Sequence, residues 1–157
     1  MNVGFISTRL AGTDGVTLET IKWARICRDL GHSTFFCAGQ LDPEISPGFL
    51  LPEAHFTHPD IVALQAKCLG VRTRSAETTD QLHELRRRLK AGITEFAKKF
   101  AIDLLVPQNV LTIPMNLPLG MALTEFIAET GIHTVAHHHD FYWERQRFII
   151  KIGRAHV

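Results

Sequence analysis

Five short apolar runs along the chain have the length and composition of buried β-strands. They are rich in Val, Ile, Phe and Thr, and segments containing Gly, Pro or Asn separate them from one another. Runs of this kind that alternate with helical segments predict a parallel sheet covered by helices. The expected strands are residues 2–7, 32–38, 51–56, 102–106 and 132–137.

The segments between these runs repeat apolar residues every three or four positions, which predicts amphipathic helices. The clearest is expected from Thr79 to Phe100, and Thr78 and Gln81 have capping-box spacing at its start. Asn116 is expected to cap a further helix that runs to Glu129. The other expected helices are residues 16–30 and 59–69.

This alternation predicts the α/β fold class, as a Rossmann-like doubly wound parallel sheet. In such sheets, ligands bind beyond the carboxyl ends of the strands. Three polar connections are expected there, namely residues 7–15, 107–116 and 137–147. We therefore expect these three segments to meet on one rim of the sheet.

The composition limits the class of protein without naming a function. The chain has 157 residues, 45% of them hydrophobic, which suits one globular domain over residues 1–150. A net charge of +1 gives no reason to expect nucleic-acid or membrane partners. Three cysteines without a C-x-x-C pair indicate reduced thiols, and no signal peptide is evident. We therefore expect a cytoplasmic location.

The last seven residues continue none of these patterns. Residues 151–157 contain Ile-Gly-Arg-Ala-His-Val, which resembles the translation of a common sequencing-library adapter. A genuine frayed C-terminus is the alternative. We expect this tail to be non-native and the natural protein to continue beyond residue 150.

The first candidate binding segment is the glycine-containing loop Gly12-Thr13-Asp14-Gly15. It leaves the first strand and opens a helix, whose N-terminal N–H groups could hold a phosphate or a sugar hydroxyl. Asp14 would repel a phosphate, so it favours a hydroxyl or a helix cap. A capped turn without a binding role remains an equal alternative.

The second candidate is the histidine run that follows the last expected strand. Side chains alternate along a strand, so His137 and His139 share one face and His138 points the other way. Three adjacent histidines therefore cannot all bind one metal, and we expect no metal. His139 is the candidate catalytic group, with Asp140 either orienting the imidazole or binding a hydroxyl of its own.

Charged residues beside aromatic rings follow this pair. Glu144 and Arg145 come after Tyr142 and Trp143, a combination that suits sugar hydroxyls and ring faces. It suits an interface between domains equally well. The basic stretch from Arg86 to Lys90 is expected on the solvated side of the long helix.

These segments together resemble the N-terminal half of glycosyltransferase family 4 proteins. The resemblance rests on Gly12-x-x-Gly15-Val, on Leu30-Gly-His32 before a strand, and on the ending that contains His139-Asp140. The segment from Asn109 to Gly120 is similar to a strand-to-helix loop in a subset of the family. The likeness covers nearly all of residues 1–150.

The resemblance implies a two-domain transferase of GT-B type, of which this chain is the acceptor-side part. The missing C-terminal domain would bind a nucleotide-diphosphate sugar as co-substrate, and no further cofactor or metal is implied. A sugar or small hydroxyl compound would be the acceptor. The residues implied on the acceptor side are His139 and Asp140 as catalytic groups and Gly12, Thr13, Asp14, Gly15, Asn109, Glu144 and Arg145 as binding groups.

The function expected from this resemblance is retaining sugar transfer, with the fragment inactive on its own. Catalysis would depend on positioning and on electrostatic help to the departing diphosphate. Two alternatives stay open: a non-catalytic carbohydrate-binding or interaction module, and a nucleotide-binding Rossmann enzyme. The absence of G-x-G-x-x-G counts against the second alternative.

Overall fold

The computed structural model describes residues 1–145 and residue 148. The tail at residues 151–157, expected to be non-native, lies outside the described residues, and so does the expected domain boundary at residue 150. No helix within the described residues is both long and apolar enough to cross a lipid bilayer.

Five parallel strands form one sheet in the order β3-β2-β1-β4-β5. The order reverses between β1 and β4, as expected for a doubly wound Rossmann-like sheet. The strands are β1 (Asn2–Ser7), β2 (Ser33–Ala38), β3 (Gly48–Leu50), β4 (Leu104–Pro107) and β5 (His133–Thr134). The predicted α/β fold class is thus confirmed.

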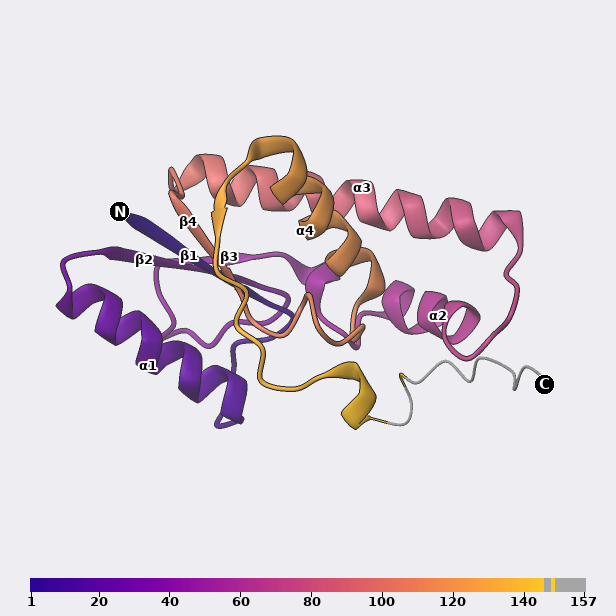
Figure 1. Ribbon diagram of the computed structural model, residues 1–157, viewed down its shortest axis with the longest axis horizontal. Helices are drawn as coiled ribbons and strands as arrows, with labels where there is room; N and C mark the ends of the chain where they lie inside the picture. Colours follow the sequence, from indigo (N-terminus) through magenta and orange to yellow (C-terminus); the bar gives the residue numbers. More distant parts are fainter. Residues whose placement is uncertain (146–147, 149–157) are drawn as a thin grey trace, which may run out of the picture.

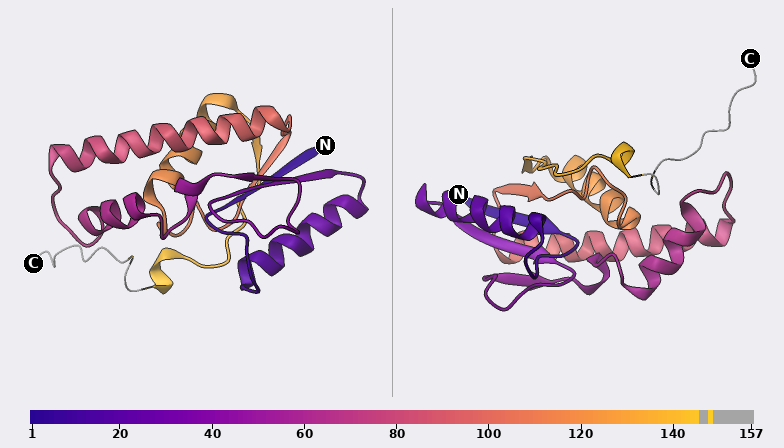
Figure 2. Two further views of the ribbon diagram at one scale, coloured as in Figure 1. Left: turned by 180° about the vertical axis from the view of Figure 1, so that it is seen from behind. Right: turned by 90° about the horizontal axis from the view of Figure 1, so that it is seen from below.

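Helices cover both faces of the sheet (Figure 1). Helix α1 packs on one face, whereas α3 and α4 pack side by side on the other. Helix α2 packs against the N-terminal half of α3, which projects past the sheet (Figure 2). The helices are α1 (Gly15–Asp29), α2 (Pro59–Cys68), α3 (Ala76–Lys99) and α4 (Leu117–Thr130), with short 3-10 turns η1 (Pro52–Ala54) and η2 (Tyr142–Glu144).

Strand β1 divides the core because its side chains alternate between the two faces. Val3 and Phe5 pack in the cluster that includes Ala24 of α1, whereas Ile6 packs with α3 and α4. These side chains are at most 1% exposed. The buried strand fixes where the chain leaves the sheet, and so places the loop that begins at Ser7.

The third strand lies a few residues earlier than the sequence predicts. We expected residues 51–56, but β3 is Gly48–Leu50 and η1 follows it at Pro52–Ala54. Pro52 has no N–H to give to a strand ladder and favours the first turn of a helix. The predicted position of the third strand was therefore wrong, because Pro52–Ala54 form a helical turn and not a strand.

The start of α3 also differs from the prediction. The helix begins at Ala76, and its cap is Ser75, whose hydroxyl accepts a hydrogen bond from the N–H of Thr78 at 3.1 Å. The predicted capping box at Thr78 and Gln81 was therefore wrong by one turn. The predicted cap of α4 is confirmed, because Asn116 Oδ1 accepts from the N–H of Leu119 at 3.0 Å.

Candidate functional site

An open cavity of about 600 Å³ lies where α1 begins and the last described segment passes. The segment at residues 137–145, drawn in yellow-orange, passes the end of the sheet at which α1 starts (Figure 1). Two of the three predicted polar segments therefore share this cavity. Its lining residues are Asp14, Gly15, Val16, Glu19, His137, His139, Asp140 and Arg145.

The loop at Gly12–Gly15 is a capped turn, and several backbone N–H groups in it and in the first turn of α1 are already engaged. Gly12 has a φ of 73°, and its N–H donates to Asp42 at 2.6 Å. Asp14 caps α1, because one carboxylate oxygen accepts from the N–H groups of Val16 and Thr17, each at 3.1 Å. Thr13 is exposed in this loop. The arrangement leaves less room for a phosphate than for a hydroxyl.

Asp14 is held as a carboxylate by its neighbours. Arg9 Nη2 lies 2.8 Å from Asp14 Oδ2, and the Thr17 hydroxyl lies 3.0 Å from the same oxygen. Burial raises the pKa of Asp14, but the hydrogen bonds from Arg9 and Thr17 outweigh burial, so its pKa lies below the ordinary value. Asp14 is therefore an ionised hydrogen-bond acceptor at neutral pH.

The second predicted polar segment does not line the cavity, but its Asn109 contacts two residues that do, His139 and Asp140. Asn109 has a left-handed φ of 62° and is 8% exposed. Its Oδ1 accepts from the backbone N–H of His139 at 2.6 Å and of Asp140 at 3.2 Å, while its Nδ2 donates to Asp140 Oδ2 at 3.2 Å. Asn109 thus holds the His139-Asp140 pair in place.

The ladder between β4 and the last segment continues past the end of β5. The N–H of Val135 donates to Leu105, that of His137 donates to Pro107, and that of Asn109 donates to the carbonyl of His137, each at 2.9 Å. We predicted a strand over residues 132–137, but β5 is only His133–Thr134. The chain nevertheless continues beside β4 as far as a bridge between Gln108 and His137. This path carries His139 and Asp140 onto the rim.

The three histidines divide between two sides, as predicted. The rings of His137 and His139 are 4.3 Å apart, and Trp23 of α1 lies 4.5 Å from the other side of His137. His138 points away from them and hydrogen-bonds Thr112. The side of the strand that carries His137 and His139 therefore faces α1.

The imidazole of His139 is oriented by Gln108. The His139 Nε2 atom lies 2.8 Å from Gln108 Oε1. Burial, and then the neighbouring His137, lower the pKa of His139, which favours the neutral ring. Asp140 instead pairs with Arg145 at 2.7 Å. Of the two roles expected for Asp140, binding a hydroxyl is the one that this geometry leaves open.

Arg145 and Glu144 lie differently with respect to the cavity. Arg145 lines it and pairs with Asp140, whereas Glu144 is exposed and its carboxylate accepts from the N–H of Phe141 at 2.8 Å. The rings of Phe141 and Trp143 stack beside this turn at 4.5 Å. A binding role for Glu144 remains a prediction, and its observed contact stabilises η2.

The charge of the cavity favours ligands that donate hydrogen bonds. Its lining contains three carboxylates, those of Asp14, Glu19 and Asp140, against the single guanidinium of Arg145. The hydrogen bond from Lys22 is the first of several interactions that lower the pKa of Glu19 despite some desolvation. Within residues 1–145 and 148, no three His, Cys, Asp or Glu side chains gather as metal ligands. The cavity is suited to hydroxyl groups.

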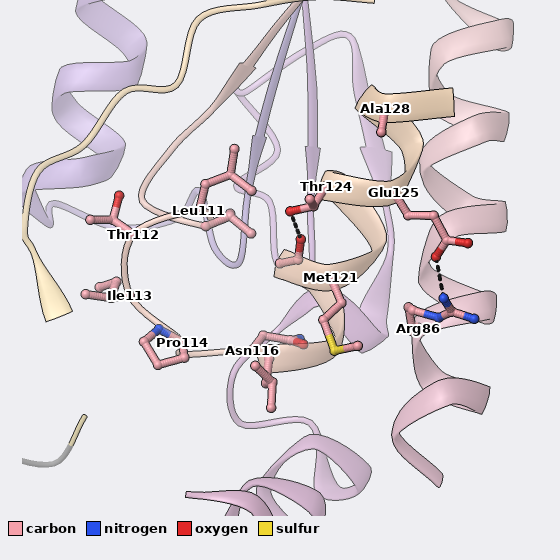
Figure 3. A pocket seen from close by; sticks show the side chains of 13 residues that line it. Arg86, Leu111, Thr112, Ile113, Pro114, Asn116, Met121, Thr124, Glu125 and Ala128 are labelled. Carbon is pink, nitrogen blue, oxygen red and sulfur yellow. Dashed lines mark hydrogen bonds and ion pairs between the residues drawn. The ribbon is translucent and has the colours of Figure 1, made fainter. Parts of the chain in front are cut away.

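A second groove, between residues 110–117 and α4, has a different chemical character. Leu111, Ile113, Pro114 and Met121 line it (Figure 3). At its edge the Thr124 hydroxyl donates to the Gly120 carbonyl at 2.9 Å, and Arg86 pairs with Glu125. The groove measures about 530 Å³ and presents mainly hydrocarbon. Among the described residues, its charged lining residues are Arg86 and Glu125, which pair with each other, and its lining includes no histidine.

Sequence reasoning missed Glu19, which lines the first cavity, and three residues that contact its lining. Arg9 and Gln108 lie in or beside the predicted polar segments, and Glu19 and Trp23 lie on the first helix. Of these four residues, Gln108 could have been identified from the sequence, because it is a polar residue directly after an apolar strand. The contacts of Arg9, Glu19 and Trp23 depend on how the elements pack, which the sequence pattern does not specify.

Comparisons with known proteins place this chain beside two enzymes. It is 29% identical over 145 residues to the mannosylglucosylglycerate synthase of Petrotoga mobilis, covering 92% of this chain and 33% of that protein. It is 30% identical over 152 residues to the mannosylglucosylglycerate synthase of Thermotoga maritima, covering 95% and 34%. The chain thus spans about a third of the length of these relatives.

No protein-family profile matches the chain, and no solved structure matches it either. The two relatives are glycosyltransferases, and the aligned region includes nearly the whole described fold. The similarity supports a glycosyl-transfer function.

Proposed function

We propose that this chain is the acceptor-binding part of a retaining glycosyltransferase of family 4 and GT-B type. In this proposal a sugar moves from a nucleotide-diphosphate sugar to a hydroxyl of an acceptor held in the cavity at Asp14, His139 and Asp140. The names of the relatives suggest a mannosyl group as the sugar and glucosylglycerate, or a related glycoside, as the acceptor.

The observation that carries the proposal is the convergence of the α1 cap and the His139-Asp140 pair on one cavity. Ionised carboxylates and a neutral imidazole accept hydrogen bonds, which is what a polyhydroxylated ligand requires. Asn109 holds the His139-Asp140 pair because its Oδ1 atom accepts hydrogen bonds from the backbone N–H groups of both residues. A rigidly held site of this kind acts by positioning the acceptor hydroxyl near the donor.

The donor diphosphate is proposed to bind elsewhere, in a further domain that this chain does not include. Three carboxylates line the cavity, and a diphosphate would be repelled by them. The N–H groups at the start of α1 are also occupied by Asp14. The same two facts weigh against the nucleotide-binding Rossmann enzyme as an alternative, because that class holds its phosphates at this helix end.

Calorimetric titration of the 157-residue chain with glucosylglycerate tests the proposal. We expect saturable binding that Asp140→Asn weakens about tenfold, the effect of one lost charge-assisted hydrogen bond. Thr124→Ala, in the apolar groove, is the matched control and should leave the affinity unchanged. Binding that Thr124→Ala abolishes and Asp140→Asn does not would refute the proposed site, and tight NAD binding would favour the nucleotide-binding class instead.

A further inference from the structure

Gln108 occupies a buried position at the point where β4 ends. It is 1% exposed, its backbone N–H donates to the carbonyl of Ile6 at 2.8 Å, and it bridges to His137 across the edge of the sheet. Its side chain extends to His139, and the Oε1 to Nε2 distance is 2.8 Å. Within the described residues its Nε2 atom is buried without a hydrogen-bond partner, so the packing around the side chain and the contact of Oε1 are what hold the carboxamide.

The Oε1 atom of Gln108 is the carboxamide atom that faces the ring, and this orientation decides which ring nitrogen of His139 carries the proton. A carboxamide oxygen can only accept, so the imidazole must donate from Nε2. In a neutral ring, Nδ1 is then the atom with the free lone pair. Nδ1 has no hydrogen bond within the described residues and is not among their enclosed unpaired atoms, and His139 is one of the residues that line the cavity.

The backbone of His139 is held by the residue next to Gln108. Asn109 Oδ1 accepts from the His139 N–H at 2.6 Å, so consecutive residues fix the main chain and the ring of the same histidine. The ring of His137, tilted by 39° and 4.3 Å away between centroids, packs against the ring of His139 and limits its rotation. These restraints act on orientation, which is the property that a hydrogen-bonding group in a site must preserve.

We propose that Gln108 is a positioning residue that holds neutral His139 in its Nε2–H tautomer, so that Nδ1 accepts a hydrogen bond from a hydroxyl of the bound ligand. The identity of that ligand as a sugar acceptor rests on the proposed function. The tautomer is a property of this chain alone and does not depend on transferase activity.

The tautomer can be measured directly by long-range proton–nitrogen NMR of the 157-residue chain labelled with ¹⁵N-histidine. His139→Gln assigns the signals, and exposed His133 serves as an internal reference. At a pH above the pKa of His139, we expect a protonated Nε2 and a bare Nδ1. A protonated Nδ1 in the unmodified chain would overturn the proposal.

Two variants separate positioning from simple packing. Gln108→Leu fills the same space without an acceptor, so we expect the ring to populate both tautomers and glucosylglycerate affinity to fall about tenfold. Gln108→Glu keeps an acceptor oxygen at this position, so we expect this variant to retain the Nε2–H tautomer. It provides a test even if Gln108→Leu does not fold. An unchanged tautomer in Gln108→Leu, or its loss in a folded Gln108→Glu, would contradict the assignment.

The binding and tautomer measurements can fail separately. If glucosylglycerate does not bind the unmodified chain but the spectra show the predicted tautomer and its loss in Gln108→Leu, the proposed acceptor is wrong and the role of Gln108 stands. If glucosylglycerate binds and the tautomer is the opposite one, the proposed function stands and the role of Gln108 is wrong.

Discussion

At the residue scale, each carboxylate of the cavity already pairs with a cationic side chain. Asp14 pairs with Arg9, Asp140 pairs with Arg145, and Glu19 pairs with Lys22. A carboxylate has about four lone-pair positions, so it can accept from a bound hydroxyl in addition to these partners. The cavity therefore combines stable charges with spare capacity to accept hydrogen bonds.

The lowered pKa of His139 predicts a pH dependence of stability. Between the folded pKa and the ordinary value of 6.5, the unfolded chain binds more protons than the folded chain. The free energy of unfolding should therefore fall as the pH is lowered through 6.5 and should stop falling, for this residue, below the folded pKa. Urea denaturation across this range measures the slope.

The control for this prediction is His139→Gln, which removes the titrating group. The variant should have a shallower slope, but some slope should remain because burial, with Arg9 and His58, also lowers the pKa of His55. A slope equal to that of the unmodified chain would show that His139 does not titrate as the structure implies.

Prediction at this scale succeeded for residues whose position follows from the strand pattern. His139, Asp140 and Asn109 directly or closely follow expected strands, so they could be placed on one rim from sequence alone. Gln108 and Arg9 also follow strands closely, but what they do depends on one partner each, His139 for Gln108 and Asp14 for Arg9. A partner depends on rotamers and on distances between elements, which no periodicity encodes.

At the element scale, the cap of α4 connects the site to the core. Asn116 is 2% exposed, and besides capping Leu119 its Nδ2 donates to the carbonyls of Glu53 at 2.8 Å and Ala54 at 3.1 Å. It therefore ties the start of α4 to the η1 turn. Ser75 caps α3 without comparable donation to a distant segment.

These two caps give a matched prediction. Asn116→Ala should lower the free energy of unfolding by about 2–4 kcal/mol, because it removes a cap and leaves two carbonyls without their donor. Ser75→Ala should cost about 1 kcal/mol, the usual effect of one lost cap. Chemical denaturation measures both, and equal losses would contradict the bridging role of Asn116.

A close backbone approach sets a second prediction at this scale. A Cβ atom at Gly39 would lie 2.0 Å from the backbone nitrogen of His55, so an alanine there must displace main chain. Gly39→Ala should destabilise the fold by about 3 kcal/mol. Gly15→Ala is the control, because nothing lies within 4 Å of its Cβ position, and it should change stability by less than about 1 kcal/mol.

Thermal or urea unfolding of Gly39→Ala and Gly15→Ala compares the two positions directly. Similar stability in both variants would mean that the backbone at Gly39, directly after β2, is not as close to that of His55, directly after η1, as described.

Most helices and strands could be predicted because a long periodic pattern of apolar residues determines which side of an element is buried. The face of α3 at Leu82, Leu85 and Leu89 is buried as expected, and β1 has the predicted bounds. Short elements were less predictable, since β3 has only three residues and its place depends on pairing with β2. A pairing partner that is distant in sequence leaves no local signal.

At the scale of the whole molecule, the parallel sheet brings separate segments to one rim. The starts of α1 and of the last described segment are far apart in sequence, yet Asp14 and Asp140 line the same cavity. The order β3-β2-β1-β4-β5 places β1 beside β4 and β4 beside β5, which makes this meeting geometrically necessary. The sequence was sufficient to predict a shared rim because the carboxyl ends of parallel strands all lie at one edge of the sheet, and the strand order then makes these segments neighbours.

The distribution of charge at this scale separates two surfaces. The rim cavity carries carboxylates, while the groove beside α4 is apolar. A glycoside with many hydroxyl groups suits the first surface, and neither surface offers a cluster of cations for a diphosphate. This division is the reason that we propose the acceptor, and not the donor, for the rim cavity.

The most direct test of this assignment is a crystal structure of the 157-residue chain with glucosylglycerate. The account predicts the glycoside in the rim cavity, with hydroxyl groups hydrogen-bonded to Asp140 and to Nδ1 of His139. A glycoside seated in the apolar groove beside α4, with the rim cavity empty at saturating concentration, would contradict it.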